Sequence, residues 1–392
     1  MTSPLTPQLT TLQHATPQPD PSSFTPPSAA PAGDRVRPRL KQGAFVISRA
    51  QSSYVGRMDS GIEVFSQTRV ALASLEGVLT CAEIADLHNL ASSQVFELIS
   101  VLEDAHLLDT MTSKIAVHAR FHSANAHRAS HSSDDTNDGA YQQLQAKLSP
   151  ELSFTTWLPR VRDGGVRAMG ERRNTTVEIH GDSRIAVLIF GILLASGVSS
   201  ARVISKESRT ITDTDLAANF LRTTDIGLPI QDRLKECVRD LSLFPSAPAG
   251  TAQLENRTIA VCVGPVPAEK VQEWLSRGIA HLFVDNPDGA SITIGPFVIP
   301  GQSPCLRCLA LKKDECNEAW KDVSWHLATA TPREVPVAVA HHVAGLAALE
   351  ILRFIDEGKS TLVGASDRID YHNPRGSERS VFTRHPACGC AW

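Results

Sequence analysis

The sequence of 392 residues predicts an α/β protein with a Rossmann-like, doubly wound, mostly parallel sheet in its second half. Three observations carry this prediction. From about Gln142 onward, short apolar segments typical of strands alternate with segments whose apolar residues recur at helical spacing. Residues 39–118 hold shorter segments that predict a separate small domain, and cysteines near the C-terminus predict a zinc-stapled lobe. The chain is long enough for two or three domains.

Residues 1–38 are rich in Pro, Ser and Thr and hold few aliphatic residues, so we predict a disordered tail there. The small domain, residues 39–118, reads as a winged helix-turn-helix, because short strands accompany three helices. Its predicted elements are strands 44–48 and 61–65, helices 68–75, 82–87 and 93–105, and a wing at 107–117. A polar linker is predicted at residues 119–140.

The remaining residues, 141–392, are predicted as the α/β domain, with helices on both faces of the sheet. Its predicted strands are 176–180, 201–206, 258–263, 281–284 and 291–299. Its predicted helices are 184–196, 229–241, 268–277 and 336–355. The apolar run at 185–198 is too short to cross a bilayer unaided, so we interpret it as a buried core helix and expect no membrane association.

Four cysteines form two close pairs that lie far apart in the sequence: Cys305 with Cys308, and Cys388 with Cys390. Four thiolates without a histidine suit a closed, structural zinc site, which would fasten the last residues onto the fold. The first pair has a standard chelating spacing, whereas the second has only Gly389 between its thiols. Ordinary reduced thiols are the alternative, and a disulfide ranks third because nothing indicates export.

The composition suits a folded protein of a reducing compartment. Hydrophobic residues make up 42% of the chain, charged residues 20%, and the formal net charge is −4. No charged start followed by an apolar segment opens the chain, and the four other cysteines are scattered singly. We therefore predict a cytoplasmic location.

The charge of the small domain argues against nucleic-acid binding. Residues 39–118 hold six basic and nine acidic residues, a formal charge of −3, and the helix at 92–106 has no Arg or Lys. Phosphate neutralisation supplies most of the affinity for DNA, so we expect no nucleic-acid partner. An extended peptide could instead add to the strand at 61–65 beside that helix.

Three apolar residues at helical spacing are candidates for contacts with such a peptide: Val95, Leu98 and Leu102. The alternative is that these side chains face the small core of the domain.

Several motifs give the second half a resemblance to a known family. The segment His180-Gly181-Asp182-Ser183 after a predicted strand, Ala195-Ser196-Gly197-Val198 and Asp225-Ile226-Gly227-Leu228-Pro229 resemble the nucleotide-binding half of the ubiquitin-activating, ThiF/MoeB-type adenylyltransferases. The cysteine pairs fit the same family. A winged helix in front of such a domain, with His385-Pro386-Ala387-Cys388 near the C-terminus, is similar to the ThiF-like proteins of thiazole/oxazole-modified peptide biosynthesis.

The sequence departs from that family where the nucleotide is handled. Gly181 remains, but Ser183 and Ala186 stand at the family's other two glycine positions. By the resemblance, Ala218 replaces an arginine and Asp215 an asparagine, Ile230 replaces a lysine, and Val263-Gly264-Pro265 replaces the segment with the magnesium-binding aspartate. Without these cations the phosphoryl charge lacks its electrostatic stabilisation. We therefore expect no ATP cofactor, and interpret Gly181, Ser183 and Glu207 as a vestigial nucleotide site.

The resemblance implies a non-catalytic scaffold. Such a protein binds the leader of a precursor peptide through its winged helix and presents it to a YcaO-type cyclodehydratase. The resemblance also implies a homodimer. Tethering of this kind raises the effective concentration of the substrate without new chemistry. Two alternatives stay open: an active ATP-dependent adenylyltransferase, and a winged-helix DNA-binding regulator.

Overall fold

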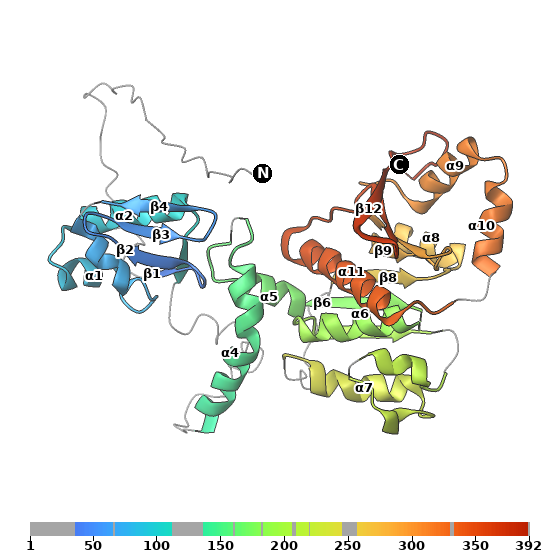
Figure 1. Ribbon diagram of the computed structural model, residues 1–392, viewed down its shortest axis with the longest axis horizontal. Coiled ribbons are helices and arrows are strands. Elements are labelled where there is room, and N and C mark those ends of the chain that lie inside the picture. Colours follow the sequence, from blue (N-terminus) through green and yellow to red (C-terminus); the bar gives the residue numbers. More distant parts are fainter. Residues whose placement is uncertain are drawn as a thin grey trace, which may run out of the picture.

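The computed structural model describes residues 36–65, 67–111, 136–159, 161–181, 183–205, 209–218, 220–244, 257–329 and 333–390. A small N-terminal unit, residues 36–111, lies to one side of a larger α/β domain, and the helices α4 and α5 lie between them (Figure 1). The predicted tail falls outside the described residues except at its end, where Arg37 and Pro38 already belong to the first strand.

The N-terminal unit combines two small sheets with helices. Strands β1 (Arg37–Leu40) and β5 (Leu108–Met111) pair antiparallel. Strands β2 (Phe45–Ser48), β3 (Ser53–Gly56) and β4 (Gly61–Val64) form an antiparallel sheet in the order β2-β3-β4. The 3-10 helix η2 (Gln67–Ser74) and the helices α1 (Cys81–Leu87) and α2 (Ser92–Asp104) follow.

Local chemistry accounts for the start of α1. The Thr80 hydroxyl accepts from the backbone N–H of Glu83 at 3.3 Å, and the Glu83 carboxylate accepts from the N–H of Thr80 at 2.7 Å. This reciprocal pair is a capping box, which satisfies two backbone donors that a helix start leaves unpaired. The buried side chains of α1 and α2 then pack with Val55 and Val64 of the sheet into one core.

The predicted strands and the last two predicted helices of this unit are confirmed within one or two residues. The segment at 68–75 is a 3-10 helix and not an α-helix, and strands β1 and β3 were not predicted. Of the predicted wing, the structure describes a strand up to Met111 that pairs with β1, and residues 112–117 lie outside the described residues.

The next elements are α4 (Thr136–Thr155) and α5 (Val166–Arg173). Residues 136–140 were predicted as part of the linker, but they are helical and form the start of α4. The rest of the predicted linker lies outside the described residues.

The large domain is built on a seven-stranded sheet in the order β12-β11-β10-β9-β8-β6-β7. Four strands run parallel: β6 (Thr175–His180), β7 (Ser200–Ile204), β8 (Arg257–Val263) and β9 (Ala280–Val284). Three run antiparallel to their neighbours: β10 (Ser291–Val298), β11 (Ala365–Asp370) and β12 (Asn373–Val381).

The predicted mostly parallel sheet is therefore wrong for its second half, and the sheet is mixed. A parallel crossover needs a dozen or more residues. Only residues 285–290 separate β9 from β10, and only Tyr371 and His372 separate β11 from β12. These short connections allow hairpins alone.

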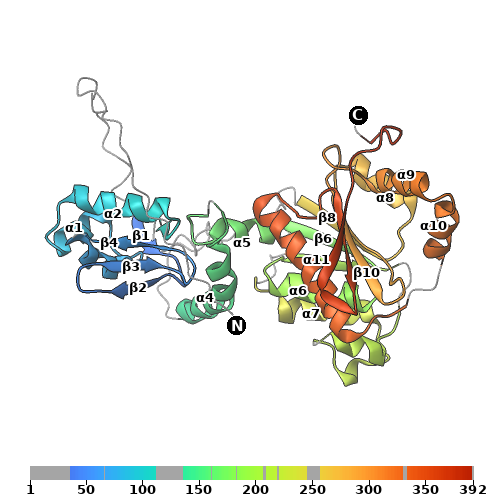
Figure 2. The same ribbon diagram turned by 45° about the horizontal axis from the view of Figure 1, so that its top comes forward.

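Helices cover both faces of the sheet, as predicted (Figure 2). On one face, α6 (Arg184–Ala195), α7 (Ile230–Leu241) and α11 (Val337–Glu357) pack into the main core. On the other face, Trp274 of α8 (Ala268–Ser276) packs against Ala260, Cys262 and Phe283 of the sheet. The helices α9 (Leu306–Cys316) and α10 (Trp320–Thr329) follow near α8.

By length and composition alone, α11 is apolar enough to span a membrane, and it is the one such helix among the described residues. Half of its most apolar window is buried inside the protein, where Val343, Ala347 and Ile351 pack against α6 and the sheet. This packing is that of a helix in the core of a folded domain.

Candidate functional site

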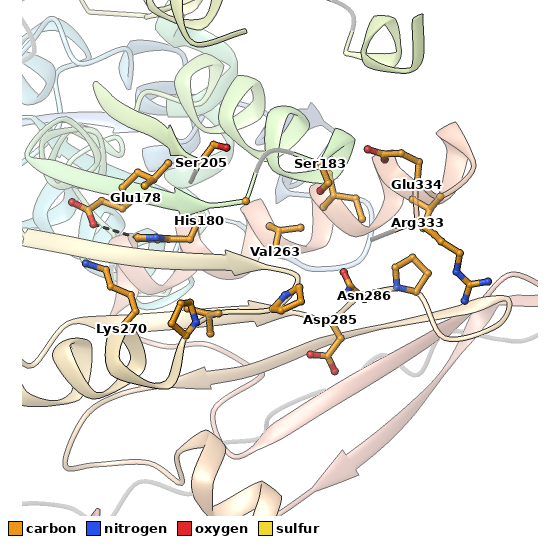
Figure 3. A pocket seen from close by; sticks show the side chains of 18 of the residues that line it. Glu178, His180, Ser183, Ser205, Val263, Lys270, Asp285, Asn286, Arg333 and Glu334 are labelled. Carbon is orange, nitrogen blue, oxygen red and sulfur yellow. Dashed lines mark ion pairs between the residues drawn. The ribbon is translucent and has the colours of Figure 1, made fainter. Parts of the chain in front are cut away.

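A cavity of about 1050 Å³ lies at the carboxyl ends of the parallel strands, the place where open α/β sheets bind their ligands (Figure 3). Its walls come from the ends of the parallel strands and the residues that follow them, from α8 and from a segment that precedes α11. The lining includes His180 at the end of β6, Gly181 and Ser183 after it, Ser205 after β7, Val263 and 265–267 around the end of β8, 285–287 after β9, and 333–335 before α11.

Gly181 is required by the fold itself at the edge of this cavity. Its φ is +119°, and a Cβ at this position would lie 2.4 Å from the carbonyl oxygen of Val263 on the neighbouring strand. The close approach of two strand ends therefore explains this glycine without a nucleotide.

Ser183 occupies the N-cap position of α6, but its hydroxyl makes no cap hydrogen bond. The Oγ atom is buried and has no hydrogen-bond partner among the described residues. The third predicted member of the vestigial site, Glu207, lies outside the described residues.

Two positions that the sequence resemblance matches to cations of the adenylyltransferases hold core side chains. Ala218 and Ile230 are fully buried in the main hydrophobic core. Asp215 is also buried, and its carboxylate accepts two hydrogen bonds from Arg209, at 2.7 and 2.8 Å, and one from the N–H of Thr212. Burial alone would raise the pKa of Asp215, but these hydrogen bonds hold it below the usual range. Asp215 thus stabilises a loop and does not line the cavity.

Most cations that do line the cavity are paired. Arg202 forms an ion pair with Glu178, and Lys270 forms one with Glu273 at 2.8 Å. His180 Nε2 lies 3.5 Å from the other oxygen of Glu178, and burial lowers the pKa of this histidine, which favours its neutral form. Arg333 is exposed and forms no ion pair within the part of the chain that the structure describes.

Lys270 and Arg333 were not predicted as site residues. Both reach the cavity from elements whose arrangement depends on the folded sheet, one from α8 and one from the segment before α11. At the end of β8, Val263, Gly264 and Pro265 bring no carboxylate to the cavity. The carboxylates of Asp285 and Glu334 do line the cavity, but they come from the segment after β9 and the segment before α11.

The four predicted metal ligands lie together. The thiol groups of Cys305, Cys308, Cys388 and Cys390 lie within 4.8 Å of one another. The Sγ atoms of Cys305 and Cys388 are 3.4 Å apart, as are those of Cys308 and Cys390, and Cys305 and Cys308 are separated by 3.9 Å. Four sulfurs at about 2.3 Å from a tetrahedral zinc would be roughly 3.8 Å apart, so this donor set fits zinc.

Local structure explains how the two pairs meet. Cys305 is the N-cap residue of α9 and Cys308 lies in its first turn. Cys388 and Cys390 flank Gly389, whose φ of +73° allows the tight turn between them. Cys305, Cys308 and Cys388 are buried against the same cluster as Trp274. A metal here would join α9 to the C-terminal turn, and it has no open position for a substrate.

The three residues predicted to contact a peptide are buried. Val95, Leu98 and Leu102 are almost fully buried in the core of the N-terminal unit, as the alternative interpretation had it, and so offer no surface to a peptide. The apolar side chains that α2 exposes are Phe96 and Val101. Strand β4 is at one edge of its sheet, and Phe65 just beyond it is largely exposed.

The large domain combines a mixed seven-stranded sheet, a cavity at the carboxyl ends of its parallel strands and a cluster of four cysteines. The chain matches no protein-family model and no curated protein sequence. Solved structures share its fold at low sequence identity.

Escherichia coli MccB bound to ATP superimposes with a TM-score of 0.59 at 13% identity, covering 90% of this chain and 99% of MccB. The microcin C7 biosynthetic enzyme MccB in complex with N-formylated MccA gives a TM-score of 0.58 at 13% identity, covering 91% and 99%. Selenomethionine PaaA gives 0.55 at 13% identity, covering 88% and 100%. The similarity therefore spans both the N-terminal unit and the α/β domain.

Proposed function

We propose that the protein is a non-catalytic ThiF-like scaffold that binds the leader of a precursor peptide and presents it to a YcaO-type cyclodehydratase. The partner would then modify Cys, Ser or Thr side chains of the peptide. One observation carries the proposal: the cavity keeps its place at the strand ends, but Ala218 and Ile230 are core residues and the end of β8 brings no carboxylate. Phosphate and magnesium would lack their usual partners there.

Binding of a peptide is supported by the fold. MccB, which shares both units, has been solved in complex with MccA. In the N-terminal unit, β4 is an edge strand, and an edge strand offers unpaired backbone groups to an added strand. We propose that the leader pairs with β4, with apolar side chains toward Phe65 and the exposed face of α2.

A titration tests this proposal. Candidate leader peptides from neighbouring reading frames are added to the full-length protein, with and without the encoded cyclodehydratase. We expect saturable binding that Phe96→Asp weakens at least 10-fold, because an exposed aromatic anchor carries much of such an affinity. Leu87→Asp, on exposed Leu87 of α1, is the matched control and should leave the affinity unchanged. Absence of saturable binding in both conditions refutes the scaffold.

An active ATP-dependent adenylyltransferase is the second candidate, because MccB with the same fold has been solved with ATP. Its test is ATP-dependent pyrophosphate exchange with a peptide carboxylate, together with ATP binding by calorimetry. Exchange above background would replace the scaffold by an enzyme, whereas a scaffold shows neither signal.

A further inference from the structure

The junction between the N-terminal unit and the α/β domain is fixed by buried polar contacts. The segment after α4, residues 156–162, lies against the N-terminal unit, and we call it the latch loop; its Arg160 lies outside the described residues. It makes hydrogen bonds to three parts of that unit: the end of β1, the β1–β2 turn and β5. These contacts join segments more than 40 residues apart in the sequence.

Lys41 and Asp109 form the centre of this contact. Both are only 3% exposed. The Lys41 ammonium donates to the carbonyl oxygens of Thr156 at 2.7 Å and Val161 at 2.9 Å. The Thr156 hydroxyl lies 2.7 and 2.8 Å from the two oxygens of Asp109, to which it donates. Burying such groups is costly unless they are hydrogen-bonded. Moving the latch loop away would leave the buried ammonium and carboxylate without these partners.

Trp157 adds an aromatic contact beside this polar centre. Its indole N–H donates to the carbonyl oxygen of Gln42 at 2.8 Å. The guanidinium of Arg57 lies 4.9 Å from the ring centroid, and the ammonium of Lys41 lies 5.6 Å from it. Cations at such distances are attracted to the face of an indole.

The helices on either side of the latch loop, α4 and α5, are held to the α/β domain by Arg172 on α5. Its guanidinium donates to both oxygens of Asp356 on α11, at 2.9 and 2.6 Å. It also donates to Glu151 on α4 at 2.6 Å and to the carbonyl oxygen of Ser196 at the end of α6 at 2.8 Å. The piece that carries the latch loop is therefore held to the α/β domain as well as to the N-terminal unit.

We propose that the latch loop locks the N-terminal unit in one orientation on the α/β domain, with Lys41, Asp109 and Trp157 as positioning residues. The lock itself is independent of any ligand. Its use, holding a bound leader at a constant position relative to the α/β domain, rests on the proposed function.

Small-angle scattering of the full-length protein tests the lock. Lys41→Met and Trp157→Ala remove the central donor and the aromatic contact, and we expect both to increase the radius of gyration and the maximum dimension. Lys235→Met and Trp325→Ala are the matched controls, since Lys235 and Trp325 are exposed on α7 and α10, and their profiles should superimpose on that of the wild type. Far-UV circular dichroism must show wild-type secondary structure for every variant.

If Lys41→Met fails to fold, Trp157→Phe, which removes the indole donor but keeps an aromatic ring, gives a second measurement. Unchanged scattering in folded variants, or a wild-type profile that already requires several orientations, overturns the lock.

Peptide titration distinguishes failure of the proposed use of the lock, which is to hold a bound leader in place, from failure of the proposed function. The variants should keep the leader affinity within about 2-fold and lose stimulation of the cyclodehydratase, whereas a wild-type protein that binds no leader refutes the scaffold and leaves the lock standing.

Discussion

Arg172 illustrates how single buried charges stabilise this protein. Its guanidinium is almost completely buried and satisfies the carboxylates of Asp356 and Glu151. Burial alone would lower the pKa of Arg172, but its two carboxylate partners raise it, so the group stays charged in the folded protein. The ion pairs thus stabilise the packing of α4 and α5 on α11.

Replacing this arginine should be expensive in free energy. Arg172→Met leaves the buried Asp356 carboxylate without its partner, and we expect a loss of about 3–5 kcal/mol in the free energy of unfolding. Urea denaturation followed by circular dichroism measures it. Lys235→Met, which removes an exposed ion pair with Asp232, is the control and should cost less than about 1 kcal/mol. Equal losses would contradict the role assigned to Arg172.

Gly181 and Gly227 allow backbone strain to be separated from steric contact. Both have a positive φ, but a Cβ at Gly227 meets nothing within 4 Å, whereas one at Gly181 meets the Val263 carbonyl oxygen at 2.4 Å. We expect Gly227→Ala to cost about 1–2 kcal/mol from conformation alone. Gly181→Ala should cost at least roughly 1 kcal/mol more, because a strand end must move. Thermal denaturation compares them, and similar melting temperatures would refute the contact.

His281 gives the stability a specific pH dependence. It is completely buried beside Trp274 and Phe283, and burial lowers its pKa to about 4. The unfolded state binds a proton near pH 6.5 and the folded state does not, so this contribution is complete above pH 6.5 and is lost as pH falls toward 4.

Between pH 7 and pH 5 the contribution of His281 should fall by about 2 kcal/mol. His281→Phe should remove that part of the pH dependence in urea denaturation, whereas His372→Gln, at an exposed position, should not. Parallel pH profiles for the wild type and His281→Phe would show that His281 does not titrate in this way.

At the scale of elements, the predictions succeeded where one face of a segment is strongly apolar. The strands β6, β8 and β9 and the helices α6, α7, α8 and α11 were predicted within about two residues of their observed ends. Their side chains form the cores, so their spacing records burial directly.

The two missed strands of the large sheet lack that pattern. Strand β12 reads Asn-Pro-Arg-Gly-Ser-Glu-Arg-Ser-Val and lies at the edge of the sheet, where polar side chains face water. Strand β11 carries Asp367 and Arg368. Pairing with β10 and with each other holds them in the sheet, and that pairing is tertiary information which periodicity does not contain.

The candidate sites also differed in how far the sequence could predict them. The cysteine cluster was predictable because chelating thiols have a characteristic spacing within each pair. The leader contacts were not, because helical spacing alone does not tell which apolar residues face the core. Phe96 is a neighbour in sequence of the buried Val95 and points the other way.

The C-terminal turn should depend on metal for its position. Cys388→Ser with Cys390→Ser removes two of four ligands, so we expect loss of one zinc per chain and a melting temperature lower by on the order of 5–10 °C. Atomic spectroscopy and calorimetry measure these quantities. Cys316→Ser, at an exposed thiol outside the cluster, is the control and should keep both. Retention of one zinc in the double variant would contradict the assignment.

At the scale of the whole molecule, one helix connects the two places on which the proposals rest. The segment that leads into α11 borders the cavity through Arg333, Glu334 and Val335, and near the other end of the helix Asp356 holds Arg172. A helix of 21 residues is a stiff rod roughly 30 Å long. A ligand whose binding displaced the start of α11 would therefore act on the anchor of the N-terminal unit.

Thermodynamic linkage makes such an effect reciprocal: a ligand in the cavity that alters the leader affinity by some factor has its own affinity altered by the leader to the same degree. If the protein is a scaffold, the cavity would then serve as an allosteric input, with α11 transmitting the effect.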